Sequence, residues 1–362
     1  MIQTKKLLEN ITRMSPNSEG RIGQVYRFDR NEKTIPFPED HLKNILNTIH
    51  PDEMTAYPNL VPFYQRLVQW LKVDRENVLV WAGSDTAIRA VYEVYVEGGD
   101  EVVILSPTYG MFYVYGRMFG ATTKEVFYDN DFSLPVERIL AEINEKTKCV
   151  VLSNPNHTGT VIRQDDLLKI IKAAQKVDAL MVLDEAYYHF NKVTMLAFIN
   201  DFDNLLIIRT FSKAFGIASL RIGYTVSNKE IISHLDKVKL THEITSFSAK
   251  VGCYMLDHLE ILNDYVKDVN EAKDVLYSRM PEMGFEVLNS EGNFVFFKGH
   301  KYIDGKDLMA ELEKEKMFIK GPFSNVPFSG HLRVSVGTSE QMNMFCDTIT
   351  RIIKKNRSGL NK

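Results

Sequence analysis

The segment TFSKAFGIASLRIGY, residues 210–224, decides how this chain is interpreted. It follows a short apolar run, Leu205–Ile208, that predicts a buried strand. Lys213 lies in it among small and apolar residues, with Thr210, Ser212 and Arg221 nearby. A lysine sheltered from water can act as a neutral nucleophile, as Schiff-base chemistry requires, and hydroxyls with a guanidinium suit a phosphate. A surface lysine after a strand is the simpler interpretation of one Ser-Lys pair, so the rest of the chain must decide.

Four apolar runs upstream of this segment also predict buried strands, and each ends in a polar, turn-rich stretch; they cover residues 78–81, 101–105, 148–152 and 179–183. Helical patterns separate them, so the rhythm from 78 to 226 indicates a mainly parallel α/β sheet covered on both faces. In open parallel sheets the binding site lies at the carboxyl ends of the strands.

Three of these strand ends carry candidate residues. Gly83-Ser84-Asp85 leads from a strand into a helix and offers free backbone amides to an anion, although Ser and Asp are also ordinary helix caps. Tyr109 follows the next strand and could stack on a flat ligand or pack in the core. Asp184 ends the strand at 179–183, where a buried carboxylate needs a partner. That partner could be a backbone amide, an arginine or a protonated ring nitrogen.

With 362 residues, the chain is long enough for two domains or one large α/β unit. The predicted division is an N-terminal arm with part of a small domain over 1–44, a large domain over 45–235 and a smaller α+β domain over 236–362. In the last of these, residues 247–274 predict one long amphipathic helix.

The composition excludes several classes of protein. A net charge of -3 gives no reason to expect a nucleic-acid or membrane partner, and the three cysteines lack the spacing of a metal or redox site. No signal peptide and no apolar run of membrane-spanning length is recognisable. We therefore expect a cytoplasmic protein without a metal site.

A series of loop motifs is more specific than any of its members: Asn31-Glu32, Tyr57-Pro58, Gly83-Ser-Asp85, Pro107-Thr-Tyr109, Asn154-Pro-Asn156-His-Thr-Gly159, Asp184-Glu-Ala-Tyr187, Thr210-Phe-Ser-Lys213, Leu220-Arg-Ile-Gly223, Gly292-Asn-Phe294 and Leu332-Arg-Val-Ser-Val-Gly337. In order and spacing they resemble the pyridoxal-phosphate-dependent aminotransferases of the aspartate aminotransferase fold (class I and II, fold type I). The histidinol-phosphate aminotransferase branch is the most similar. The resemblance runs from about Arg27 to Ile353.

The resemblance implies pyridoxal 5'-phosphate as cofactor and a role for each motif residue. Lys213 would bond to the cofactor aldehyde and act as general base and acid. Asp184 would keep the pyridine nitrogen protonated. The other cofactor contacts would be Asn156 and Tyr187 to the ring hydroxyl oxygen, Tyr109 stacked on the ring, Ser84, Asp85, Thr210, Ser212 and Arg221 at the phosphate, and Tyr57 from the second subunit of a homodimer. The substrate would be held by Arg333, with Lys320 and Asn31 nearby.

Two departures from the family pattern affect these roles. The loop Asn154–Gly159 is one residue shorter than the usual Asn-Asn-Pro-Thr-Gly form, so the choice of Asn156 over Asn154 stays open. Lys320 stands where relatives have an arginine; it keeps the charge but not the bidentate geometry. His157, in the shortened loop, is interpreted as structural.

The implied activity is transfer of an amino group between L-glutamate and a small, phosphorylated keto or aldehyde substrate. A decarboxylase of a phosphorylated amino acid on the same fold is the alternative, because it would use the same cofactor residues. A ligand-sensing regulator is a third interpretation. The presence of Lys213, Asp184 and Arg221, and the lack of a recognisable DNA-binding region, argue against it.

Overall fold

A seven-stranded sheet forms the centre of the chain. In a computed structural model that describes residues 4–9, 11 and 25–360, its strand order is β2-β8-β7-β6-β5-β3-β4. The strands are β2 (Val78–Ala82), β3 (Glu101–Ser106), β4 (Thr122–Phe127), β5 (Thr147–Ser153), β6 (Leu180–Asp184), β7 (Leu205–Thr210) and β8 (Ile222–Ser227). Only β8 runs antiparallel to its neighbours, β7 and β2. The prediction of a mainly parallel sheet is therefore confirmed.

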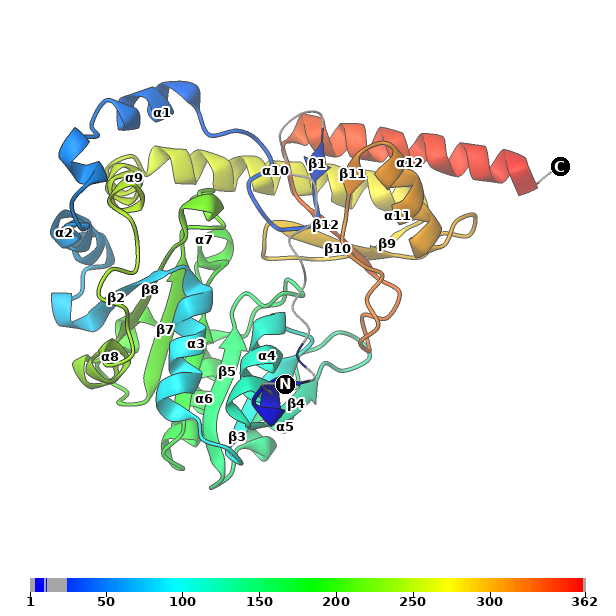
Figure 1. Cartoon of the computed structure of the whole chain (residues 1–362). Coiled ribbons are helices and arrows are strands. Elements are labelled where there is room, and N and C mark those ends of the chain that lie inside the picture. The colour runs from blue at the N-terminus through cyan, green and yellow to red at the C-terminus, as the bar shows by residue number, and fades with distance from the viewer. Residues whose placement is uncertain (1–3, 10, 12–24, 361–362) are drawn as a thin grey trace.

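Helices cover both faces of this sheet (Figure 1); they are α3 (Ser84–Tyr95), α4 (Gly110–Phe119), α5 (Val136–Glu142), α6 (Gln164–Gln175) and α8 (Lys229–Asp236). Because strand side chains alternate between faces, Val103 and Leu105 of β3 enter one core cluster while Val102 and Ile104 enter another. This two-sided burial explains why the strands are continuous apolar runs.

A second layer contains a small antiparallel sheet with order β12-β10-β9, formed by β9 (Glu286–Leu288), β10 (Phe294–Lys298) and β12 (Leu332–Ser335). The N-terminal arm reaches this layer, since β1 (Tyr26–Arg27) pairs in parallel with β11 (Met317–Phe318). The helices of this half are α11 (Gly305–Lys314) and α12 (Ser339–Leu360), and α12 lies beside the long helix α10 (Glu260–Glu282), as Figure 1 shows.

The remaining helices are α1 (Glu39–Leu46), α2 (Val61–Leu71), α7 (Tyr188–Asn191) and α9 (Ser246–Asp257). Short 3-10 turns lie at Lys6–Leu8, Pro51–Met54, Arg75–Asn77, Leu196–Phe198 and Ala218–Leu220. The prediction of one helix over 247–274 is wrong. His258 leaves the helical conformation at φ -127° and ψ 60°, and its ring stacks on Tyr254. The break lets α9 pack on α2 while α10 turns towards α12.

The predicted domain boundaries at 44/45 and 235/236 stay a prediction, and the arm over 1–44 lies partly outside the described residues. In the described part of the chain, no helix combines the length and the hydrophobicity that a membrane crossing requires.

Candidate active site

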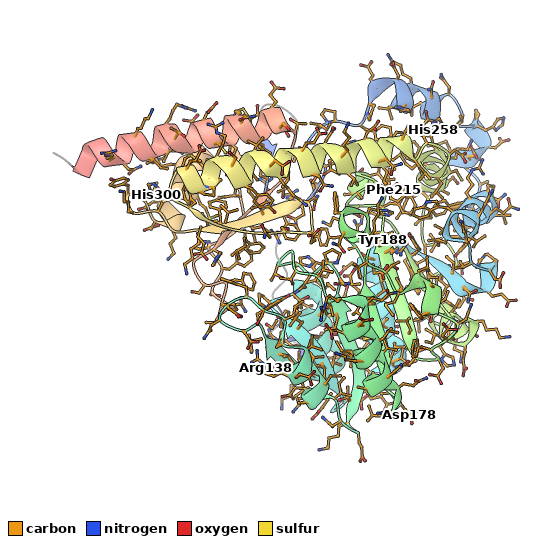
Figure 2. All side chains as sticks on the ribbon, turned by 180° about the vertical axis from the view of Figure 1, so that it is seen from behind. Arg138, Asp178, Tyr188, Phe215, His258 and His300 are labelled. Carbon is orange, nitrogen blue, oxygen red and sulfur yellow. The ribbon has the colours of Figure 1, made fainter. Side chains whose placement is uncertain are left out.

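One cavity of about 170 Å³ lies where the carboxyl ends of the parallel strands meet. In Figure 2, Asp178 marks the end of the sheet where β6 begins, and Phe215 marks the opposite end, beneath α10, where the chain leaves β7. The cavity lies at this second end. It is lined by Arg30, Glu32, Ser84, Asp85, Tyr109, His157, Asp184, Ala186, Thr210, Ser212, Lys213, Ala218 and Arg221. Larger hollows of about 420 and 610 Å³ border α2 on the outside of the molecule.

One end of the cavity is built to accept an anion. Helix α3 begins at Ser84 and directs its first backbone amides towards it, and the hydroxyls of Thr210 and Ser212 lie 3.0 Å apart at the end of β7. Arg221 adds a guanidinium. The guanidinium of Arg221 can lie this close to the backbone only because residue 83 is a glycine, at φ +85°. A Cβ there would lie 2.5 Å from Nη2 of Arg221.

The opposite side of the cavity carries a buried carboxylate. Asp184 ends β6 with 2% of its surface exposed, and one of its oxygens accepts a hydrogen bond from the backbone amide of Ala186 at 3.0 Å. Burial raises the pKa of Asp184 to about 7, and the nearby charge of Lys213 only partly opposes this. No ion pair to Asp184 is present among the described residues, so this site favours a cationic or N–H partner from a ligand.

Lys213 is half-buried between the anion end and Asp184. Its Nζ donates a long hydrogen bond of 3.4 Å to the carbonyl of Arg30, and it lies 5.7 Å from the centre of the Tyr187 ring. The amine therefore has one weak protein contact and faces the cavity, where a carbonyl compound could reach it.

The shortened loop differs from expectation. Asn156 does not line the cavity, because its amide nitrogen donates to Tyr128 at 2.6 Å and to the carbonyl of Pro107 at 3.0 Å. Its amide oxygen accepts from Thr108 at 2.8 Å. His157 of the same loop does line the cavity, with its ring stacked on Tyr109 at 5.1 Å, and the contact of Asn156 with the cofactor stays a prediction. From the sequence we interpreted His157 as structural. The loop is one residue shorter than in the family pattern, and this was the feature that could have pointed to His157 as a cavity residue.

Tyr187 and Asn31 form a bonded pair beside the cavity. Asn31 Nδ2 donates to the Tyr187 hydroxyl at 2.9 Å, and Asn31 is 1% exposed. Neither residue belongs to the cavity lining; Asn31 supports Tyr187 through this bond, and its contact with the substrate stays a prediction. The neighbours of Asn31 in sequence, Arg30 and Glu32, do line the cavity, and sequence reasoning missed both of them.

The other predicted residues lie outside the cavity of this chain. Tyr57 is 82% exposed, and its ring stacks on that of His242 at 4.4 Å. Arg333 is buried between the rings of Phe294 and Phe323, at 5.3 and 5.9 Å. Lys320 pairs with Arg333 through the backbone alone, and its side chain is exposed.

Comparison with known proteins gives a consistent result. The sequence profile of the aminotransferase class I and II family matches residues 26–349. The histidinol-phosphate aminotransferase of Caldanaerobacter subterraneus subsp. tengcongensis is 31% identical over 334 residues, which cover 91% of this chain and 93% of the relative.

Two solved structures share the fold. One is the histidinol-phosphate aminotransferase of Sinorhizobium meliloti in complex with pyridoxal-5'-phosphate, with a TM-score of 0.82, 22% identity and 90% of each chain covered. The other is the aspartate aminotransferase of Thermus thermophilus with maleate, with a TM-score of 0.79, 21% identity and 91% of each chain covered.

Proposed function

Because the chain belongs to the aminotransferase class I and II family, we propose that it transfers an amino group between L-glutamate and a small phosphorylated substrate of the histidinol-phosphate type, with pyridoxal 5'-phosphate as cofactor. One observation carries the proposal: Asp184 at the end of β6 lines a single cavity together with Lys213 and Arg221, which both lie in the segment that joins β7 to β8.

The residues of the cavity fit this cofactor in charge and in shape. The amides of Ser84 and Asp85, the hydroxyls of Thr210 and Ser212, and Arg221 would hold its phosphate. Gly83 and Gly223 leave room for this end, since a Cβ on Gly223 would lie 2.4 Å from the backbone nitrogen of Ser84. Asp184, buried without an ion-pair partner, would meet the pyridine nitrogen, and Tyr109 would cover the ring.

When bound, the cofactor supplies an aldehyde for the amine of Lys213 and an electron-accepting ring. The chain supplies the proton transfers and the orientation. Lys213 Nζ would accept the proton from the substrate carbon that bears the amino group and return it two atoms away, across the nitrogen, in the 1,3-proton shift that transamination requires. Asp184, as a carboxylate, would hold a proton on the ring nitrogen. The bond between Asn31 and Tyr187 fixes the Tyr187 ring, whose centre lies 5.7 Å from Lys213 Nζ.

Arg333 and Lys320 are proposed to recognise the anionic ends of the substrate. Arg333 is buried and its Nε has no hydrogen-bond partner among the described residues, so a substrate carboxylate or phosphate would complete its bonding. Lys320, whose backbone pairs with that of Arg333, would add positive charge for the substrate through its exposed side chain.

Spectroscopy tests this proposal. The purified protein with cofactor should show the visible band of the lysine-bound form, and L-glutamate without an acceptor should convert it to the amine form. Histidinol phosphate should do the same, whereas histidinol, which lacks the phosphate, should be at least about 100-fold less effective in kcat/KM because charge-assisted contacts are lost. Equal rates with both compounds would remove the phosphate from the proposal, and no response to glutamate would remove the donor.

The decarboxylase alternative is not favoured, since the named relative and both solved structures are aminotransferases. Release of carbon dioxide from a phosphorylated amino acid, without conversion of the cofactor by glutamate, would revive it.

We also propose a cytoplasmic homodimer in which Tyr57 reaches the cofactor phosphate of the neighbouring subunit. Tyr57 is one of several large apolar or aromatic side chains that the chain exposes between residues 42 and 61 and at residue 240; the others are Leu42, Leu46, Met54, Val61 and Leu240. Light scattering coupled to gel filtration tests the dimer. A monomer at micromolar concentration that shows full activity would exclude a role for Tyr57 across an interface.

A further inference from the structure

His157 is a polar residue of the cavity that has no established task. It extends from the short loop after β5 into the cavity that also holds Lys213 and Asp184. Its ring is stacked on Tyr109 at 5.1 Å and meets the edge of Tyr187 at 5.5 Å, with 77° between the ring planes. The ring atom Nδ1 is buried without a hydrogen-bond partner among the described residues. A buried, unpaired ring nitrogen beside a ligand cavity points to a ligand.

The loop fixes this orientation from both sides. Asn154 exchanges hydrogen bonds with the backbone of Ile162 at 2.8 and 3.2 Å, and Asn156 is engaged by its three partners. After His157, Thr158 bonds Tyr128 at 2.9 Å. Gly159 follows at φ +89° and lies close to Ser290, because a Cβ on Gly159 would be 2.4 Å from Oγ of Ser290. These contacts hold the backbone on both sides of His157, and the rings of Tyr109 and Tyr187 pack against its imidazole.

The charges around the imidazole favour its neutral form. Burial lowers the pKa of His157 well below its usual value, and the positive charges of Arg333 and Lys213 lower it further. The acidic residues that line the same cavity are Glu32, Asp85 and Asp184, and the rings of Tyr109 and Tyr187 pack against the imidazole. A neutral imidazole carries one N–H donor and one lone pair, so it can donate to a ligand oxygen as an amide does.

We propose that His157 replaces the expected Asn156 and donates a hydrogen bond to the hydroxyl oxygen of the cofactor ring. This inference rests on the proposed function. It makes His157 a residue that tunes the cofactor, because a donor at the ring oxygen withdraws electron density from it. The oxygen then holds a proton on the neighbouring lysine-bound nitrogen less firmly, and that nitrogen loses its proton at a lower pH.

The test compares matched variants of the full-length protein loaded with pyridoxal 5'-phosphate. His157→Phe keeps a ring for Tyr109 but removes the N–H, and His157→Asn restores a donor. His300→Phe is the control. His300 packs on Phe285, and Figure 2 shows that it lies in the other half of the molecule. The readouts are the pH midpoint of the visible band of the lysine-bound cofactor and the cofactor dissociation constant.

For His157→Phe we expect the midpoint to rise by about one pH unit and the dissociation constant to rise about tenfold, which equals about 1.4 kcal/mol. His157→Asn should return both values most of the way, and His300→Phe should change neither. A folded His157→Phe variant with the midpoint of the unchanged protein would overturn the inference, because loss of packing alone would not move this titration.

Nitrogen-15 NMR of histidine-labelled, unchanged protein covers the case in which His157→Phe does not fold. A ring nitrogen signal that is missing from His157→Asn should shift when pyridoxal 5'-phosphate is added. If that signal stays in place while the visible band forms, the inference is wrong and the proposed function stands. If no band forms at all, both are wrong.

Discussion

The side-chain amide of Asn31 donates a 2.9 Å hydrogen bond to the hydroxyl of Tyr187, and so joins the N-terminal arm to the loop that follows β6. Asn31 is also tied to the small sheet, since its backbone nitrogen donates to Oγ of Ser335 at 2.8 Å and its carbonyl accepts from Asn293 at 3.1 Å. One residue thereby links both halves of the molecule next to the cavity.

Replacing Asn31 should separate its side-chain bonds from its backbone conformation. Asn31 has φ +54°, which glycine adopts freely and alanine does not. Asn31→Gly should lower the free energy of unfolding by about 1–3 kcal/mol, because Tyr187 and Ser335 lose a buried partner. Asn31→Ala should be at least as unstable, because it adds backbone strain. Urea denaturation measures both variants, and an alanine variant more stable than the glycine variant would contradict this explanation.

The sequence could predict the sheet and the meeting of Asp184 with Lys213, because buried parallel strands are continuous apolar runs whose carboxyl ends converge. It could not predict that β8 runs antiparallel, since the pattern is the same in both directions, nor the helix break at His258, because the apolar period continues across it. The exchange of Asn156 for His157 depends on tertiary contacts of an irregular loop, which no periodicity reports.

The buried pair of Glu185 and Arg209 lies directly behind Asp184. Two nitrogens of Arg209 donate to one oxygen of Glu185 at 2.7 and 2.9 Å, and both side chains are almost fully buried. Glu185→Gln leaves the guanidinium without its counter-charge and should lower the free energy of unfolding by about 3–5 kcal/mol. The double variant Glu185→Leu/Arg209→Met removes both charges and should lose less, as urea denaturation can show. If the loss of stability in the double variant equals the sum of the losses in Glu185→Leu and Arg209→Met measured singly, a charge effect is excluded.

Asp184 should make the cofactor-free protein less stable as the pH rises. Its pKa is about 7 in the folded chain and 3.8 as a free side chain, so the folded state binds more protons between these values. Stability contributed by the protonated carboxyl is therefore present below about pH 4 and lost as the pH rises through 7. The difference corresponds to at most about 4 kcal/mol.

Asp184→Asn tests this linkage because the amide does not titrate. The cofactor-free variant should be more stable than the unchanged protein at pH 8 and lose less stability between pH 5 and pH 8, as measured by urea denaturation. It should also bind pyridoxal 5'-phosphate more weakly, because it cannot offer a charge to the ring nitrogen. The same pH slope in both proteins would assign the titration to another group.

Lys213→Ala should prevent the covalent attachment of the cofactor and lower kcat at least about 1,000-fold, since the residue also transfers protons. Lys213→Arg is the matched control, because it keeps the positive charge without a nucleophilic amine. Borohydride reduction followed by peptide mass spectrometry should find the cofactor on Lys213 in the unchanged protein and on no lysine in either variant. A modified peptide elsewhere in the chain would move the attachment site.

Arg333 provides a test in which a role in substrate binding and a role in folding predict opposite results. Arg333 is 9% exposed, and its Nε has no hydrogen-bond partner among the described residues. Its Nη2 donates a long hydrogen bond of 3.4 Å to the carbonyl of Asp29. Burial lowers the pKa of Arg333, so the folded protein holds this cation at a disadvantage. A group held in this way is expected to act when an anionic ligand arrives.

Arg333→Gln should therefore lower kcat/KM for L-glutamate about 100-fold or more, while the free energy of unfolding stays the same or rises. Arg333→Lys keeps the charge but not the planar guanidinium. Its kcat/KM should therefore lie between that of the unchanged protein and that of Arg333→Gln, with the loss mainly in KM. The visible band of the bound cofactor should still form in both variants, because Arg333 does not line the cofactor cavity. A large loss of stability with an unchanged kcat/KM would show that Arg333 is a structural residue. Arg30, which does line the cavity, would then be the candidate to bind the substrate carboxylate.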